Sequence, residues 1–144
     1  MNMKKIFTCL LTYGRTCLRS CLLATLAVLG LNSACGQQNF ENTDVPGFAQ
    51  LVADTNVVVL DVRTASEFAE GHIKNAINID YQQSDFHEKA KATLPLDKKI
   101  AVYCRSGRRS AGAAGILGDD GYKLVNLKGG INAWKEANMP VTTE

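Results

Sequence analysis

The chain of 144 residues has 16 basic and 14 acidic side chains, a formal net charge of +2, and 46% hydrophobic residues. This length accommodates one domain rather than two, and the hydrophobic content excludes general disorder. The near-neutral charge argues against a nucleic-acid-binding protein, which carries a strongly basic face.

The first 35 residues differ from the rest in charge and in cysteine content. They hold four of the 16 basic residues, no acidic residue and four of the five cysteines. Residues 22–31 form an uninterrupted apolar run, which is shorter than the roughly 20 residues that span a bilayer. A basic start followed by a short apolar run is typical of a signal peptide.

The end of this run predicts where the signal is removed. Residues 32–36 (NSACG) resemble the cleavage box of bacterial lipoproteins. We therefore expect residues 1–34 to be a cleaved signal peptide and Cys35 to be lipidated. The exported protein would then lie in the bacterial cell envelope, held at a membrane surface by its lipid anchor alone. Residues 35–43 are polar and are predicted to be a tether.

Two alternatives remain for this N-terminal part. One is a soluble periplasmic protein that is cut near Ala34 or Gly36 without lipidation. The other is a cytoplasmic protein with an N-terminal helix. The apolar run argues against such a helix because it is apolar on all sides and lacks an amphipathic pattern.

Residues 44–144 alternate between predicted strands and predicted helices. Runs of β-branched and other apolar residues predict strands at 57–60, 76–79, 100–103 and 124–127. Capping residues predict two helices. One is capped by Asp44 and has Pro46 in its first turn, and the other is capped by Thr64, with Glu67 completing a capping box. Further helices are predicted over 84–93, 110–120 and 131–137. This alternation predicts an α/β fold with an open, mostly parallel central sheet flanked by helices on both faces. Ligands bind beyond the carboxyl ends of the strands in such sheets.

One of these strand ends carries a cysteine in an electropositive loop. Cys104 follows the strand at 100–103 and begins the sequence CRSGRRS (104–110), which leads into a helix. Gly107 permits positive φ, so the loop can curl and turn several backbone N–H groups towards one point. These groups, the helix dipole and the three arginines favour a thiolate. Cys104 is therefore the candidate nucleophile, and it needs no general base.

Three segments resemble the single-domain rhodaneses, the thiosulfate sulfurtransferases. The first is the CRSGRRS loop. The second runs from Asp61-Val62-Arg63 through Glu67-Phe68 and Gly71-His72-Ile73 to Ala76-Ile77-Asn78, and the third is LKGGINAW (127–134). The three occur in the family's order, and the resemblance covers about residues 44–140. The predicted domain from 44 to 144 is thus identified as a member of this family.

The resemblance implies a sulfurtransferase whose nucleophile is Cys104. Cys104 would take the outer sulfur of thiosulfate, or of a similar small anionic donor, as a persulfide and pass it to cyanide or a thiol. The loop residues that would bind substrate and persulfide are Arg105, Ser106, Gly107, Arg108, Arg109 and Ser110. The residues that would support the site are Asp61, Arg63, Glu67, His72, Gly129 and Gly130. No metal or cofactor is expected, and no protein partner is indicated.

Several roles within this site remain open. The Ser106 and Ser110 hydroxyls could both donate to the sulfur, and Arg105 and Arg108 are expected to point outward. Arg109 could face substrate or brace the helix. We expect His72 to make structural hydrogen bonds and Trp134 to lie in the core. Glu67, four residues after Arg63, is a candidate ion-pair partner for that arginine.

Two other activities can be compared with sulfur transfer. The dual-specificity phosphatases use Cys-x5-Arg, whereas Cys104 and Arg109 are in the shorter spacing Cys-x4-Arg, which suits a sulfur atom better than a phosphoryl group. The main alternative is a persulfide carrier or interaction module that serves a protein partner with little turnover of thiosulfate. The intact Cys104 argues against a catalytically silent binding domain.

Overall fold

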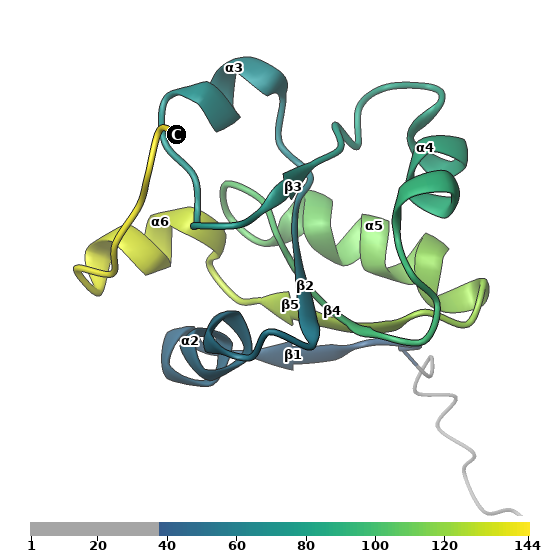
Figure 1. Cartoon of the computed structure of the whole chain (residues 1–144), viewed down its shortest axis with the longest axis horizontal. Coiled ribbons are helices and arrows are strands. Elements are labelled where there is room, and N and C mark those ends of the chain that lie inside the picture. Colours follow the sequence, from purple (N-terminus) through teal and green to yellow (C-terminus); the bar gives the residue numbers. More distant parts are fainter. Residues whose placement is uncertain (1–37) are drawn as a thin grey trace, which may run out of the picture. The chain divides into compact units, whose positions relative to one another are not determined.

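The computed structural model describes residues 38–144, which contain a five-stranded sheet with the order β1-β5-β4-β2-β3 (Figure 1). Its strands are β1 (Glu41–Thr43), β2 (Val57–Asp61), β3 (Ile77–Asn78), β4 (Lys99–Tyr103) and β5 (Lys123–Leu127). Each neighbouring pair of strands is parallel. The predicted α/β fold with a mostly parallel sheet is therefore confirmed, and this sheet is parallel throughout.

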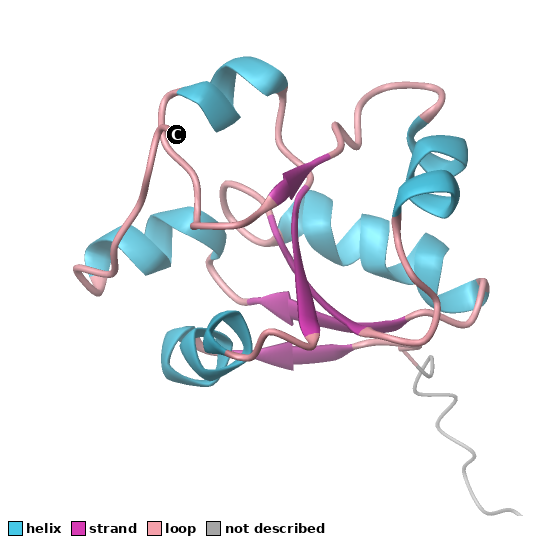
Figure 2. Cartoon of the chain, viewed as in Figure 1, coloured by secondary structure: helices cyan, strands magenta, loops and turns pink. Residues whose placement is uncertain are grey.

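Helices cover both faces of the sheet (Figure 2). They are α2 (Val45–Ala53), α3 (Ala65–Ala69), α4 (Phe86–Thr93), α5 (Arg108–Asp119) and α6 (Gly130–Glu136). On one face, Phe86 of α4 and Leu117 of α5 belong to one buried cluster. On the other, Phe48 of α2 and Trp134 of α6 belong to a second cluster, so Trp134 is a core residue as expected. None of the helices within residues 38–144 is both long and apolar enough to cross a bilayer.

Strands β2 and β4 are apolar except for one end residue each, Asp61 and Lys99, because helices cover both faces of the sheet. In β2, Val59 packs into the cluster with α2 and α6, and its neighbour Leu60 packs into the cluster with α4 and α5. In β4, Ala101 and Val102 divide in the same way. Successive side chains of a strand point to opposite faces, so the part of a strand that lies between two helical layers needs apolar residues on both faces.

Local capping signals begin two of the helices. The Asp44 side chain accepts a hydrogen bond from the Gly47 backbone N–H at 3.1 Å, and Pro46 occupies the first turn of α2. Thr64 and Glu67 form the reciprocal capping box of α3 that the sequence predicts. This box places the Glu67 carboxylate in the first turn of α3, the helix that follows the carboxyl end of β2.

The predicted tether over residues 35–43 is wrong in its last part, because Glu41–Thr43 forms the edge strand β1. The strand pairs with β5 through backbone groups, and the Asn126 side chain donates to Asn42 Oδ1 at 2.8 Å. An edge strand exposes much of its side-chain surface, so polar residues are tolerated there. The predicted signal peptide (1–34) and Cys35 lie outside the described residues.

Candidate active site

Cys104 lies directly after β4, at the carboxyl end of the sheet, and its exposed fraction is 1%. Its Sγ accepts a hydrogen bond from the Gly107 backbone N–H at 3.2 Å. The Ser110 hydroxyl donates to the same sulfur at 3.4 Å. The sulfur therefore faces the start of α5, within the loop formed by residues 104–110, which we call the Cys104 loop.

The surroundings of the sulfur favour its charged form. Burial raises the pKa of the Cys104 thiol, but the Ser110 hydroxyl and the backbone N–H groups of Ser110, Ser106 and Gly107 outweigh burial and lower the pKa below its ordinary value. Hydrogen bonds to the anionic form lower a thiol pKa in this way. The structure thus assigns the hydroxyl contact to Ser110 alone, whereas Ser106 contributes through its backbone.

The curl of the loop depends on Gly107, which has φ of 91° and precedes the first residue of α5. A Cβ atom at this position would lie 3.1 Å from the Leu127 carbonyl oxygen and 3.2 Å from the Gly129 nitrogen. Both the left-handed conformation and the close backbone contact therefore require glycine here.

The Gly129–Gly130 pair brings the start of α6 against the Cys104 loop. The Ile131 N–H donates to the Cys104 carbonyl oxygen at 2.8 Å, and the Asn132 N–H donates to the Arg105 carbonyl oxygen at 3.2 Å. A Cβ atom at Gly130 would overlap the Cys104 carbonyl oxygen. These two glycines thus let two backbone segments pass close together, which is the supporting geometry that the sequence analysis expects.

Glu67 is bound to Arg109 rather than to Arg63, so the predicted pairing of Glu67 with Arg63 is wrong. The Arg109 Nη1 and Nη2 atoms donate to the two carboxylate oxygens of Glu67, each at 2.8 Å. The hydrogen bond from Arg109 lowers the pKa of Glu67 to about 2. Arg109 therefore braces α5 against α3. The hydrogen bond to Glu67, followed by the charges of Glu67 and Cys104, raises the pKa of Arg109 although burial lowers it.

Arg63 instead forms a buried ion pair with Asp61, with Nη2 2.6 Å from Oδ2. Its Nη2 atom also donates to the Gly71 carbonyl oxygen at 2.9 Å. Burial lowers the pKa of Arg63, but the hydrogen bond to Asp61 and its negative charge outweigh burial and raise the pKa. Asp61 and Arg63 thus join the end of β2 to the loop at Gly71, as structural support.

His72 takes part in the same supporting region and makes structural contacts. Its ring stacks on Phe68 with a centroid distance of 3.7 Å. Nδ1 lies 3.0 Å from the Phe68 carbonyl oxygen and Nε2 lies 3.1 Å from the Glu144 carbonyl oxygen. Both ring nitrogens thus face backbone oxygens, as expected for a structural histidine.

The remaining polar residues of the loop face solvent. Arg105, Ser106 and Arg108 are exposed, and no ion pair involves either arginine within residues 38–144. The expectation that Arg105 and Arg108 point outward therefore agrees with the structure. Two uncompensated positive charges flank a buried sulfur.

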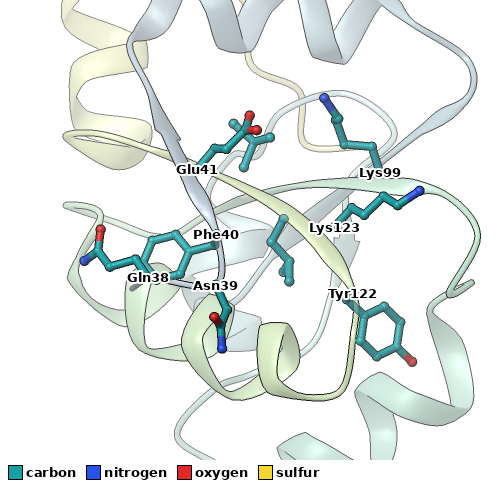
Figure 3. A pocket seen from close by; sticks show the side chains of 9 residues that line it. Gln38, Asn39, Phe40, Glu41, Lys99, Tyr122 and Lys123 are labelled. Atoms are coloured by element: carbon teal, nitrogen blue, oxygen red, sulfur yellow. The ribbon is translucent and has the colours of Figure 1, made fainter. Parts of the chain in front are cut away.

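Two pockets differ in whether a residue of the Cys104 loop lines them. One lies at the opposite end of the sheet, where Lys99 and Lys123 begin β4 and β5 as register partners (Figure 3). Its lining includes no residue of the Cys104 loop. The other pocket, of about 370 Å³, is lined by Arg105 of the loop together with residues of α3 and α6. Of these two pockets, the second is the one whose lining includes a residue of the Cys104 loop.

The second pocket is also lined by three residues that were not predicted from the sequence, namely Glu70, Asn132 and Lys135. Glu70 follows Glu67 by three residues, and Lys135 follows Asn132 by three, so each pair lies on one side of its helix. This spacing is the only signal in the sequence that could have grouped them. The spacing does not indicate that residues of α3 and α6 line the same pocket.

Comparisons with known proteins extend these observations. Residues 45–137 match the sequence profile of a family described as Rhodanese-like domain. The chain is 35% identical over 100 residues to a sulfurtransferase of Allochromatium vinosum, which covers 68% of this chain and 91% of the relative. It is 32% identical over 101 residues to the thiosulfate sulfurtransferase GlpE of Shewanella oneidensis, with 69% and 97% covered. The crystal structure of a rhodanese-related protein from Thermoplasma volcanium is similar with a TM-score of 0.66 and 37% identity, and covers 73% of this chain and 100% of that one.

Proposed function

The chain belongs to the rhodanese-like family of sulfurtransferases, and from this premise we propose that it takes sulfane sulfur from thiosulfate, or from a similar small anionic donor. The sulfur passes to cyanide or a thiol through a persulfide on Cys104. The observation that carries this proposal is the pair of hydrogen bonds to Cys104 Sγ, from the Gly107 N–H and the Ser110 hydroxyl.

The first half-reaction loads the enzyme. The Cys104 thiolate attacks the outer sulfur of thiosulfate, a new S–S bond forms, and the S–S bond of thiosulfate breaks with its electron pair leaving on sulfite. The lowered pKa of Cys104 supplies the thiolate without a general base. Arg105 and Arg108 are exposed and uncompensated, so they attract an anionic donor to the loop.

The second half-reaction discharges the enzyme. The acceptor attacks the outer sulfur of the persulfide, and the bond between this sulfur and Sγ breaks with its electron pair returning to Sγ. The N–H groups of Ser106, Gly107 and Ser110 then stabilise the restored thiolate. These donors are fixed by the loop before the reaction, so no reorganisation is needed as charge develops.

A thiosulfate:cyanide assay on the purified protein tests this proposal, with Cys104→Ser as the control. Thiocyanate formed by the wild type alone supports it, and equal activity in the variant contradicts it. A gain of one sulfur atom on Cys104 without thiocyanate favours the alternative of a persulfide carrier that serves a protein partner.

We also propose that the chain is exported and anchored by lipid at Cys35. The basic, acid-free N-terminus, the apolar run at 22–31 and the sequence NSACG support this proposal. Palmitate labelling of cells tests it. We expect labelling to be lost in Cys35→Ala and kept in the matched control Cys21→Ala, and unchanged labelling in Cys35→Ala contradicts the lipid anchor.

A further inference from the structure

The pocket of about 370 Å³ beside the Cys104 loop is bounded by two elements that are far apart in the sequence. Glu67 and Glu70 contribute from α3 and its C-terminal cap, and Asn132 and Lys135 contribute from α6. The backbone hydrogen bond from the Asn132 N–H to the Arg105 carbonyl oxygen joins α6 to the residue after Cys104. A molecule in this pocket is therefore next to the loop that carries the sulfur.

Two of the charged residues that line the pocket are already paired. Glu67 binds Arg109 through two hydrogen bonds, and Arg63 forms its buried ion pair with Asp61. Each pair is neutral as a unit, so neither leaves a charge for an occupant. These paired side chains line the pocket but offer no free charge to a bound molecule.

The other three charged residues are free to bind an occupant. Glu70, Arg105 and Lys135 are exposed, and none of them forms an ion pair within the described part of the chain. One negative and two positive charges therefore line the same small space. The complementary occupant carries both an anionic and a cationic group. A purely anionic molecule would leave the negative charge of Glu70 without a partner.

We propose that the sulfur acceptor is a small thiol with an α-amino-acid head group, and that this pocket binds the head group. The carboxylate lies between Arg105 and Lys135, where a guanidinium can bind it with two hydrogen bonds. The ammonium lies against Glu70. Ile131, which also lines the pocket, donates its N–H to the Cys104 carbonyl oxygen at 2.8 Å. A carboxylate bound at Arg105 therefore lies next to the loop that would carry the persulfide. This inference rests on the proposed function for its persulfide.

The transfer step balances without a further reactant. The acceptor thiolate attacks the outer sulfur of the Cys104 persulfide, and a new S–S bond forms between acceptor and sulfur. The Sγ–S bond breaks and its electron pair stays on Sγ as the Cys104 thiolate. The acceptor leaves as a persulfide. Its thiol proton goes to solvent before the attack, and no external oxidant or reductant is consumed.

The test examines the acceptor independently of the donor. Cys104 is loaded with sulfur in two ways, from inorganic polysulfide and from thiosulfate, and the added sulfur is followed by mass spectrometry of the protein. The loaded protein is then discharged with four thiols at equal thiolate concentration. L-Cysteine carries both charged groups, cysteamine only the ammonium, 3-mercaptopropionate only the carboxylate, and 2-mercaptoethanol neither. We expect L-cysteine to discharge the protein roughly five- to tenfold faster than 2-mercaptoethanol, because its carboxylate and its ammonium each form an exposed ion pair in the pocket.

Substitutions assign this preference to residues. Glu70→Gln should lower the L-cysteine rate to that of 3-mercaptopropionate, and Lys135→Gln should lower the rates of both carboxylate-bearing thiols. The matched controls Glu88→Gln and Lys123→Gln remove the same charges at exposed positions outside the pocket, and should change none of the four rates.

The outcomes distinguish this inference from the proposed function. Equal rates for the four thiols, unaffected by Glu70→Gln, overturn the inference and leave thiosulfate turnover intact. A protein that loads from polysulfide but not from thiosulfate, and still prefers L-cysteine, overturns the proposed donor and supports the inference. A protein that holds no sulfur from either source overturns both.

Discussion

Glu67 and Arg109 join α3 to the first turn of α5 through two parallel hydrogen bonds of 2.8 Å. Their side chains are 25% and 21% exposed, so water screens the pair only in part. The Thr64 N–H and hydroxyl also donate to Glu67, both at 3.1 Å. One carboxylate therefore caps α3 and at the same time holds the arginine that ends the curl of the Cys104 loop.

Removing the charge of Glu67 should loosen this connection. We expect Glu67→Gln to lower the free energy of unfolding by about 1–2 kcal/mol, because a bidentate, partly buried pair and a capping contact are weakened. Urea denaturation measures this change, and Glu88→Gln on the exposed face of α4 is the matched control. A Glu67→Gln variant as stable as the control would contradict a structural role for the pair.

The same pair predicts a pH dependence of stability. The pKa of Glu67 is lowered from 4.5 to about 2 in the folded protein. The stabilisation is therefore complete above pH 4.5 and is lost as the pH falls towards 2, because the folded state binds the proton less readily than the unfolded state. The difference in stability between wild type and Glu67→Gln should shrink over this range. A difference that stays constant would show that Glu67 acts without its charge.

Gly107 should be intolerant of any side chain. Gly107→Ala adds a Cβ atom 3.1 Å from the Leu127 carbonyl oxygen at a φ of 91°, and we expect a loss of about 1–3 kcal/mol of stability together with loss of sulfur transfer. Gly121 is a matched control, since its φ is also 91° and a Cβ atom there has no neighbour within 4 Å. Gly121→Ala should show only the strain of the backbone, and equal effects of the two substitutions would exclude a contribution from the close contact.

The central strands and the Cys104 loop could be predicted because their signals are local. Apolar runs specify strands that are buried on both faces, and a strand, a thiol and a curled loop follow one another within residues 100–110. Strand β1 could not be predicted in this way, because Glu41–Thr43 pairs through its backbone while its side chains are polar.

The ion pairs of the site show a different limit of sequence reasoning. The spacing of Arg63 and Glu67 suggests a pair only if both residues lie on one helix. Thr64, the N-cap of α3, has an extended backbone, so Arg63 lies outside the helix. Glu67 pairs instead with Arg109, which is 42 residues further along the chain. Such a pairing depends on how α3 and α5 meet in three dimensions, as does the pocket between α3 and α6.

Ser110 provides the sharpest test of how the loop holds the thiolate. Its hydroxyl has one proton to donate and lies 3.4 Å from Cys104 Sγ and 3.1 Å from the Gly107 carbonyl oxygen. A negative charge on the sulfur strengthens the first of these two competing hydrogen bonds.

Ser110→Ala removes the largest of the contributions that lower the pKa of Cys104, so the pKa of Cys104 should rise. The pH profile of alkylation by iodoacetamide should then shift to higher pH. Ser106→Ala is the matched control, because Ser106 acts on the sulfur through its backbone N–H, which the substitution retains. An unchanged profile in Ser110→Ala would show that the backbone alone sets the charge of the nucleophile, and an equal shift in both variants would show that the effect is not specific to the Ser110 hydroxyl.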